Sequence, residues 1–182
     1  MSDISRRYSA LARELTRRVD AVPAGRWDDP SPCEDWSARD VLQHLLDSHR
    51  DMPGHAGHPL VFEKSVQDDP HAAWVEARDA MQALLDDPDR AGMEYDGMFG
   101  RTSVEQTVDK FLGLDLLIHG WDIARATGQD EKLPEEEVAH VTEFVESLGD
   151  NLQRRGVCGP PVPVPDDASE QDKLLASLGR RP

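Results

Sequence analysis

The chain has little of what membrane and secreted proteins need. Aromatic residues make up only 5% of its 182 residues, and the mean hydropathy is -0.61. No apolar run approaches the ~20 residues of a membrane-spanning helix. The opening residues, MSDISRR, lack the apolar core of a signal peptide. We therefore expect a cytoplasmic protein that does not enter membranes.

Cysteine and positive charge are also scarce. The two cysteines, Cys33 and Cys158, lie far apart and outside any CxxC motif, so a disulfide framework is not expected. The 36 acidic residues outnumber the 20 basic ones, which gives a formal net charge of -16. Such a field repels phosphate backbones, and the arginine pairs are short and scattered. Nucleic acid is therefore not an expected partner.

What the chain has instead is helical periodicity, with apolar residues at three- and four-residue steps. It predicts helices over residues 4–22, 37–54, 72–85, 104–126 and 134–148, and a short helix near 174–178. Ser37, with Asp40 three residues later, resembles a capping box. Residues 93–99 form a hairpin or an extended connector. We expect one all-α domain over residues 1–182, with an extended proline-rich tail from residue 150 wrapping the bundle.

The most apolar of these predicted helices carries an acid near its centre. Residues 111–118 are apolar nearly all round except for Asp115, which is typical of a helix buried inside a bundle. A buried carboxylate is unfavourable unless a cation neutralises it. His119 lies four residues later on the same face. The pair could bind a metal or form a hydrogen-bonded Asp–His network, and the spacing favours neither.

A third metal ligand could come from the predicted helix over residues 37–54, which contains His44 and His49. With 3.6 residues per turn, His49 projects near the centre of the apolar face and His44 lies at its edge. Periodicity alone therefore favours His49 as the inward residue, either as a ligand or as a pocket-lining histidine.

Other side chains near the pair suggest supporting roles. Asp122 lies about one turn beyond His119 and could orient it. Arg125 could meet an anionic substrate or form a surface ion pair with Asp122. Cys33 could act as a thiol nucleophile, although its place before a helix more often reflects packing. The cations that could line a site for an anionic substrate are Arg39, Arg50, Arg101 and Arg125.

Two motifs resemble a known family. The segment PCEDWSARDVLQHL, residues 32–45, is similar to the PCxxWxxxDvxxHl signature of the DinB-like superfamily. The segment FLGLDLLIHGWDIARATG, residues 111–128, resembles the (D/E)xxxHxWDxAxAxG helix of actinobacterial proteins related to the metal-binding domain of mycothiol-dependent maleylpyruvate isomerase. The closing VPVP and DKLLASLGR segments are similar to that group's tail. The resemblance thus spans nearly the whole chain.

The resemblance implies a DinB-like four-helix bundle with extra short helices, and a divalent-metal site. Carried over position by position, the ligands are His44, Asp115 and His119, which reverses the preference for His49. Three protein ligands leave open positions, as in catalytic sites. Two histidines and one carboxylate suit zinc best, and nickel, iron, cobalt and manganese also accept such ligands.

The resemblance also implies mycothiol as a low-molecular-weight thiol co-substrate. We expect a metal-bound thiolate to attack a small electrophile in a transferase or isomerase reaction, with support from Asp122, Arg125 and His49. The isomerase has a further C-terminal domain that contributes to its active site, and this chain ends without one. Maleylpyruvate isomerisation itself is therefore not expected.

Two alternatives to a thiol-dependent enzyme stay open. One is a non-catalytic module that binds metal, a ligand or a partner protein, and the other is a metallohydrolase that uses metal-bound water. The sequence is compatible with a homodimer, but it selects neither the oligomeric state, nor the substrate, nor the native metal.

Overall fold

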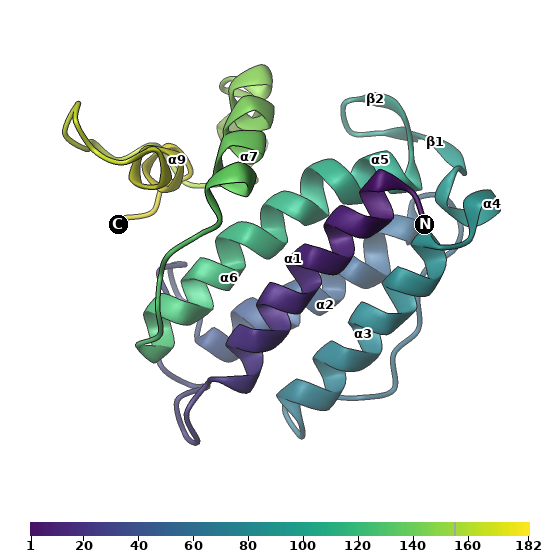
Figure 1. Cartoon of the computed structure of the whole chain (residues 1–182), viewed down its shortest axis with the longest axis horizontal. Coiled ribbons are helices and arrows are strands. Elements are labelled where there is room, and N and C mark those ends of the chain that lie inside the picture. Colours follow the sequence, from purple (N-terminus) through teal and green to yellow (C-terminus); the bar gives the residue numbers. More distant parts are fainter. Residues whose placement is uncertain (155) are drawn as a thin grey trace.

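The computed structural model describes residues 1–154 and 156–182, and the described part is helical apart from one small hairpin (Figure 1). In chain order the elements are α1 (Asp3–Asp20), α2 (Ala38–Gly54), α3 (Pro70–Leu85), α4 (Pro88–Ala91), β1 (Glu94–Gly97), β2 (Gly100–Ser103), α5 (Val104–Thr107), η1 (Val108–Leu112), α6 (Gly113–Thr127), α7 (Glu135–Leu148), α8 (Asn151–Arg154) and α9 (Glu170–Ser177). The helices predicted from periodicity are all present, with ends shifted by a few residues. No helix in the described part of the chain is both long enough and apolar enough to cross a membrane.

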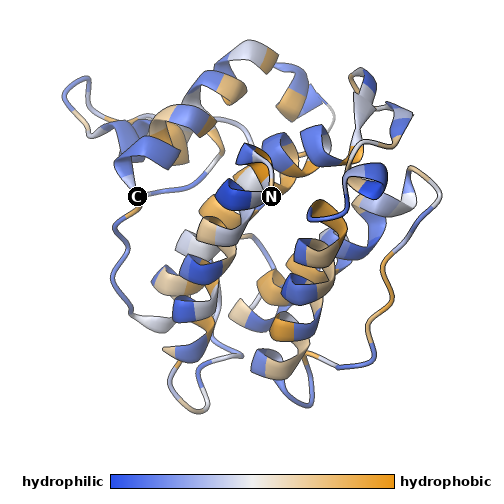
Figure 2. Ribbon diagram, turned by 45° about the vertical axis from the view of Figure 1, so that its right-hand side comes forward, coloured by the Kyte–Doolittle hydropathy of each residue, from blue (hydrophilic) through white to orange (hydrophobic). Residues whose placement is uncertain are grey.

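Four long helices form the core of the molecule. α1 packs against α3 and α6, and α2 packs against the same two helices. Hydrophobic and hydrophilic stretches alternate along these helices (Figure 2), as amphipathic helices require. Their apolar faces meet in a shared core in which Leu15, Leu45, Trp74 and Ile118 are fully buried or nearly so. The four-helix bundle expected from the resemblance is therefore present.

The start of α2 is fixed by the capping box that the sequence predicted. The backbone N–H of Asp40 donates to Ser37 Oγ at 3.2 Å, and the Asp40 carboxylate accepts from the backbone N–H of Ser37 at 2.8 Å. Two N–H groups that the helix leaves unpaired are thus satisfied reciprocally. The box sets where α2 begins, and so fixes the position of His44 two turns later.

The helical segment from α5 to α6 is not a uniform α-helix. α5 and α6 are joined by η1, a π-helical turn that ends shortly before Asp115. Arg7 of α1 lies across this turn, where Nη1 donates to the Asp109 carbonyl at 2.6 Å and Nη2 pairs with Glu137 at 2.7 Å. Gly113 leaves room for that guanidinium, because a Cβ there would lie 2.8 Å from Arg7 Nη1. Single π turns inside helices often occur beside functional sites.

The glycine-rich stretch before α5 forms the hairpin rather than the connector, since β1 pairs with β2 in antiparallel register. Beyond the bundle, α9 packs on α7 to one side of the four long helices (Figure 1). Leu174, Leu175 and Leu178 are buried there. Residues 159–165 have no regular structure, and the N–H of Val162 donates to the Ala176 carbonyl beside α9. A tail that wraps the bundle within one domain stays a prediction.

Candidate metal centre

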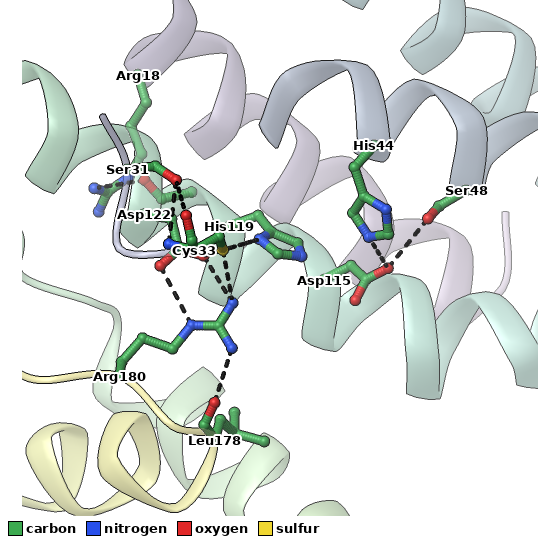
Figure 3. Close-up of polar contacts among 11 residues, drawn as sticks. Arg18, Ser31, Cys33, His44, Ser48, Asp115, His119, Asp122, Leu178 and Arg180 are labelled. Carbon is green, nitrogen blue, oxygen red and sulfur yellow. Dashed lines mark hydrogen bonds and ion pairs between the residues drawn. The ribbon is translucent and has the colours of Figure 1, made fainter. Parts of the chain in front are cut away.

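Two helices bring polar residues together where they pack. α2 contributes His44 and Ser48, and α6 contributes Asp115 and His119; each pair lies one turn apart on one helix face (Figure 3). His44 Nε2 lies 3.6 Å from Asp115 Oδ2, and Ser48 Oγ donates to that oxygen at 3.3 Å. One ligand atom from each of His44, Asp115 and His119 lies within 4.8 Å of the others. The three residues predicted as ligands therefore converge.

The group is buried on one side and accessible on the other. The side chains of Asp115 and His119 are 16% and 10% exposed, whereas that of His44 is 35% exposed. Trp36, which precedes α2, lies beside the two imidazoles, with ring centroids 5.1 Å from His44 and 6.3 Å from His119. Trp36 thus forms an aromatic wall at the accessible side.

The charges in this group favour a ligating carboxylate. Burial opposes ionisation of Asp115, but the contacts with His44, His119 and Ser48 outweigh it, so the pKa of Asp115 lies below its usual value. The Asp115 carboxylate beside His44 in turn raises the pKa of His44. Asp115 is thus ionised at neutral pH, and a proton on His44 would compete with a metal there.

The second ring nitrogen of His119 is held by Asp122. Nδ1 lies 2.8 Å from Asp122 Oδ2, and Asp122 is fully buried. Burial works against its ionisation, but the bond to His119 and the Arg180 cation lower the pKa of Asp122 to about 2. Because an ionised carboxylate only accepts, Nδ1 must donate. In the neutral ring the lone pair then lies on Nε2, and Figure 3 shows that side of the ring facing His44 and Asp115.

Cys33, His119 and Asp122 form a second cluster of donor atoms within 4.8 Å of one another. Cys33 Sγ donates to Asp122 Oδ2 at 3.3 Å, and Arg180 Nη2 donates to Cys33 Sγ at 3.4 Å. Burial, helped by the Asp122 charge, raises the pKa of Cys33 to about 12. A thiol with so high a pKa is protonated at neutral pH, which disfavours it as a free nucleophile even though Arg180 works in the opposite direction. We interpret this cluster as a hydrogen-bonded network that orients His119.

His49 lies inside the core rather than in this group. Its Nδ1 is 2.6 Å from the Leu45 carbonyl, its Nε2 is 3.0 Å from the Tyr8 hydroxyl, and its ring contacts Trp74 edge-on. Burial lowers the pKa of His49 to about 4, so it is neutral at physiological pH. Both ring nitrogens have partners in the core.

The alternative ion pair between Asp122 and Arg125 is not formed, although both residues are described. Arg125 Nη1 bonds Glu131 at 2.7 Å, and its guanidinium lies over the Trp121 ring. Asp122 is instead buried against the C-terminal segment, where Arg180 reaches it. The other arginines proposed for an anionic substrate have partners elsewhere: Arg39 bonds Asp28, Arg50 bonds Asp47 and Arg101 bonds Glu94.

Arg180 is the site residue that the sequence did not reveal. Its position depends on how the tail folds onto α6, which no local pattern specifies. The available signal was Gly179, since a glycine directly after a short helix often reverses the chain. Arg180 also lines a small crevice beside Asp115 and His119, together with Cys158 and Leu178. A larger cavity of about 850 Å³ lies between α7 and α9, and its lining includes none of the candidate ligands.

Comparison with known proteins finds a family model and two relatives that match this chain. A family model described as Mycothiol maleylpyruvate isomerase N-terminal domain matches residues 8–127. Two uncharacterized proteins of Mycobacterium tuberculosis, from strain CDC 1551 / Oshkosh and from strain ATCC 25618 / H37Rv, are each 30% identical over 164 residues, which covers 87% of this chain and 87% of each relative. No solved structure gives a significant match. The range matched by the family model contains His44, Asp115 and His119.

Proposed function

Because the chain belongs to the family of the mycothiol maleylpyruvate isomerase N-terminal domain, we propose that it is a metal- and thiol-dependent enzyme. His44, Asp115 and His119 would hold one divalent cation. The thiol would be mycothiol, and the second substrate would be a small electrophile. The reaction would be transfer of the thiol to that electrophile, or isomerisation through reversible addition of the thiol.

The donor set fits such a cation. Two imidazoles and one carboxylate suit zinc and leave coordination positions for other ligands. Asp115 is ionised, and Nε2 of His119 faces the other two residues. When bound, a divalent cation lowers the pKa of a thiol or of water, which supplies a nucleophile at neutral pH.

The surrounding residues support this assignment by fixing the ligands. Ionised Asp122 holds Nδ1 of His119, as outer partners of metal-binding histidines commonly do. Ser48 similarly holds the carboxylate of Asp115. Cys33 is a half-buried thiol whose pKa is raised to about 12, which favours a nucleophile from outside the chain. The observation on which the proposal chiefly rests is the locked His119 ring beside His44 and Asp115.

The test combines metal content with thiol consumption. After reconstitution with zinc, mass spectrometry should find about one metal per chain in the native protein and in the control His140→Ala, which changes an exposed histidine of α7. Asp115→Ala should lose the metal. Mycothiol consumption should then be measured across a panel of electrophiles and should depend on the metal.

Each other outcome has a defined meaning. Metal binding without any turnover would indicate a non-catalytic binding module instead of an enzyme. Metal-dependent hydrolysis that needs no thiol would indicate a metallohydrolase. Failure of the native protein to retain any divalent cation would overturn the proposal.

A further inference from the structure

Arg180 contacts the candidate site although it comes from the far end of the chain. Its Nη2 donates to Asp122 Oδ2 at 2.9 Å, and its Nε lies 3.3 Å from Oδ1, so the guanidinium engages both carboxylate oxygens (Figure 3). Its Nη1 donates to the Leu178 carbonyl at 3.0 Å, and the side chain is only 12% exposed. A two-point ion pair of this kind fixes the orientation as well as the position of a carboxylate.

Asp122 connects this guanidinium to a candidate metal ligand. The same Oδ2 that accepts from Arg180 also accepts from Nδ1 of His119. Asp122 has no exposed surface, so water cannot replace a lost partner without rearrangement. Removing Arg180 would therefore take away the two-point contact and leave the buried carboxylate held by His119 and the thiol of Cys33, so its orientation would be less fixed.

The backbone after α9 is built to direct Arg180 toward α6. The N–H of Gly179 donates to the Ala176 carbonyl, and the N–H of Arg180 donates to the Leu175 carbonyl, both at 3.0 Å. These two bonds make a Schellman motif, which requires a residue of positive φ, and Gly179 has φ +84°. A Cβ on Gly179 would also lie 3.1 Å from the backbone of Gly159. Both requirements restrict this position to glycine.

We propose that Arg180 is a positioning residue of the metal centre: it fixes Asp122, Asp122 fixes the imidazole of His119, and the segment after α9 thereby tunes the affinity for the divalent cation. The inference rests on the proposed function in that it takes His119 as a ligand. It assigns a role to a residue that lies outside the range matched by the family model.

Zinc affinity tests this role directly. Zinc should be titrated into metal-free native protein, Arg180→Ala, Arg180→Lys and Arg181→Ala, in competition with a chromophoric chelator. Losing the direct partner of a metal-binding histidine typically weakens metal binding ~10–100-fold. Arg180 acts one step further out, through Asp122, so we expect Arg180→Ala to fall at the lower end of that range. Arg180→Lys should recover part of the affinity, since it keeps the charge without the two-point geometry. Arg181→Ala, at an exposed neighbour, should bind like the native protein.

A double-mutant cycle separates positioning from loss of folding. If Arg180 acts through Asp122, the combined variant Asp122→Asn/Arg180→Ala should bind zinc no more weakly than Asp122→Asn alone. If the loss of zinc affinity in the double variant equals the product of the losses in the two single variants, the proposal is overturned. It is also overturned if Arg180→Ala binds zinc as tightly as the native protein does. Circular dichroism and thermal midpoints should show that every variant compared is folded.

A measurement without metal distinguishes this inference from the proposed function. In metal-free native protein, ¹⁵N NMR of the His119 ring should show the tautomer protonated at Nδ1. Arg180→Ala should shift that signal toward a mixture of tautomers, and Arg181→Ala should leave it unchanged. If the native protein binds no zinc, the proposed function fails, and this signal alone decides whether Arg180 controls His119. An unchanged signal in Arg180→Ala would overturn the inference.

Discussion

The two histidines of α2 lie five residues apart in opposite surroundings. His49 is fully buried, has a partner on each ring nitrogen and has its pKa lowered to about 4. His44 is partly exposed, and Asp115 beside it raises its pKa. The comparison indicates that His49, whose ring nitrogens already have partners, is the poorer candidate ligand of the two. The depth of a histidine in the core is a poor guide to whether it can bind a metal.

Metal affinity should give the largest contrast between the two residues. His44→Ala removes a donor atom, so zinc affinity should fall by more than the ~10–100-fold typical of an outer partner. His49→Ala should keep zinc affinity within a few-fold of native. Isothermal titration calorimetry of both variants measures this, and equal losses would show that His49 also acts on the metal centre.

Stability should rank the same two variants in the reverse order. His49→Ala opens a cavity beside Trp74 and removes the closer of the two partners of the Tyr8 hydroxyl, so the free energy of unfolding should fall by about 2–4 kcal/mol. His44→Ala should stay within about 1 kcal/mol, because its side chain is partly exposed. Urea denaturation of the metal-free proteins checks both values. A larger loss in His44→Ala would contradict the comparison.

The pH dependence of stability should separate the two residues by sign. The folded-state pKa of His49, about 4, lies below its ordinary value of 6.5, so the unfolded chain takes up a proton that the folded chain excludes. The contribution of neutral His49 is complete above pH 6.5 and is lost as the pH falls toward 4, by up to about 3 kcal/mol. His44, with a raised pKa, contributes below pH 6.5 and loses that contribution as the pH rises through its folded-state value.

Urea midpoints of metal-free protein between pH 7 and pH 4 measure this difference. The native protein should lose stability more steeply with acid than His49→Ala does. Parallel curves for the two proteins would mean that His49 does not carry this dependence.

The smallest expected effect on zinc affinity is that of Ser48, which contacts Asp115 next to His44. Ser48→Ala removes one 3.3 Å hydrogen bond to Asp115, so zinc affinity should fall by less than ~10-fold. Gln43→Ala, on the same helix but bonded to Asp47, is the matched control and should bind zinc normally. No change in Ser48→Ala would show that His44 and His119 are enough to hold Asp115.

The features that could be predicted from the sequence are local ones. Helical periodicity and the Ser37–Asp40 box depend on residues within a turn or two of each other, and the structure confirms both. Periodicity also placed His49 inward correctly, but it could not show that Leu45 and Tyr8 occupy its nitrogens. The resemblance to a family, rather than the spacing, selected His44.

The features that escaped prediction depend on contacts between distant parts of the chain. Arg7 of α1 contacts the π turn about a hundred residues later, and Arg180 contacts Asp122 from a position 58 residues further along the chain. The choice of Arg180 over Arg125 as the partner of Asp122 follows from how the tail packs. Spacing along α6 carries no information about that packing.

The chain reversal at Gly179 has a practical consequence for preparing the protein. Pro182 stands two positions after Arg180, and two extended residues span at most about 7 Å. A polyhistidine tag fused after Pro182 would therefore tether a high local concentration of imidazole next to the candidate ligands. Metal stoichiometry measured on such a fusion would report the tag together with the protein. Purification through a cleavable tag at the N-terminus, ahead of α1, avoids that artefact.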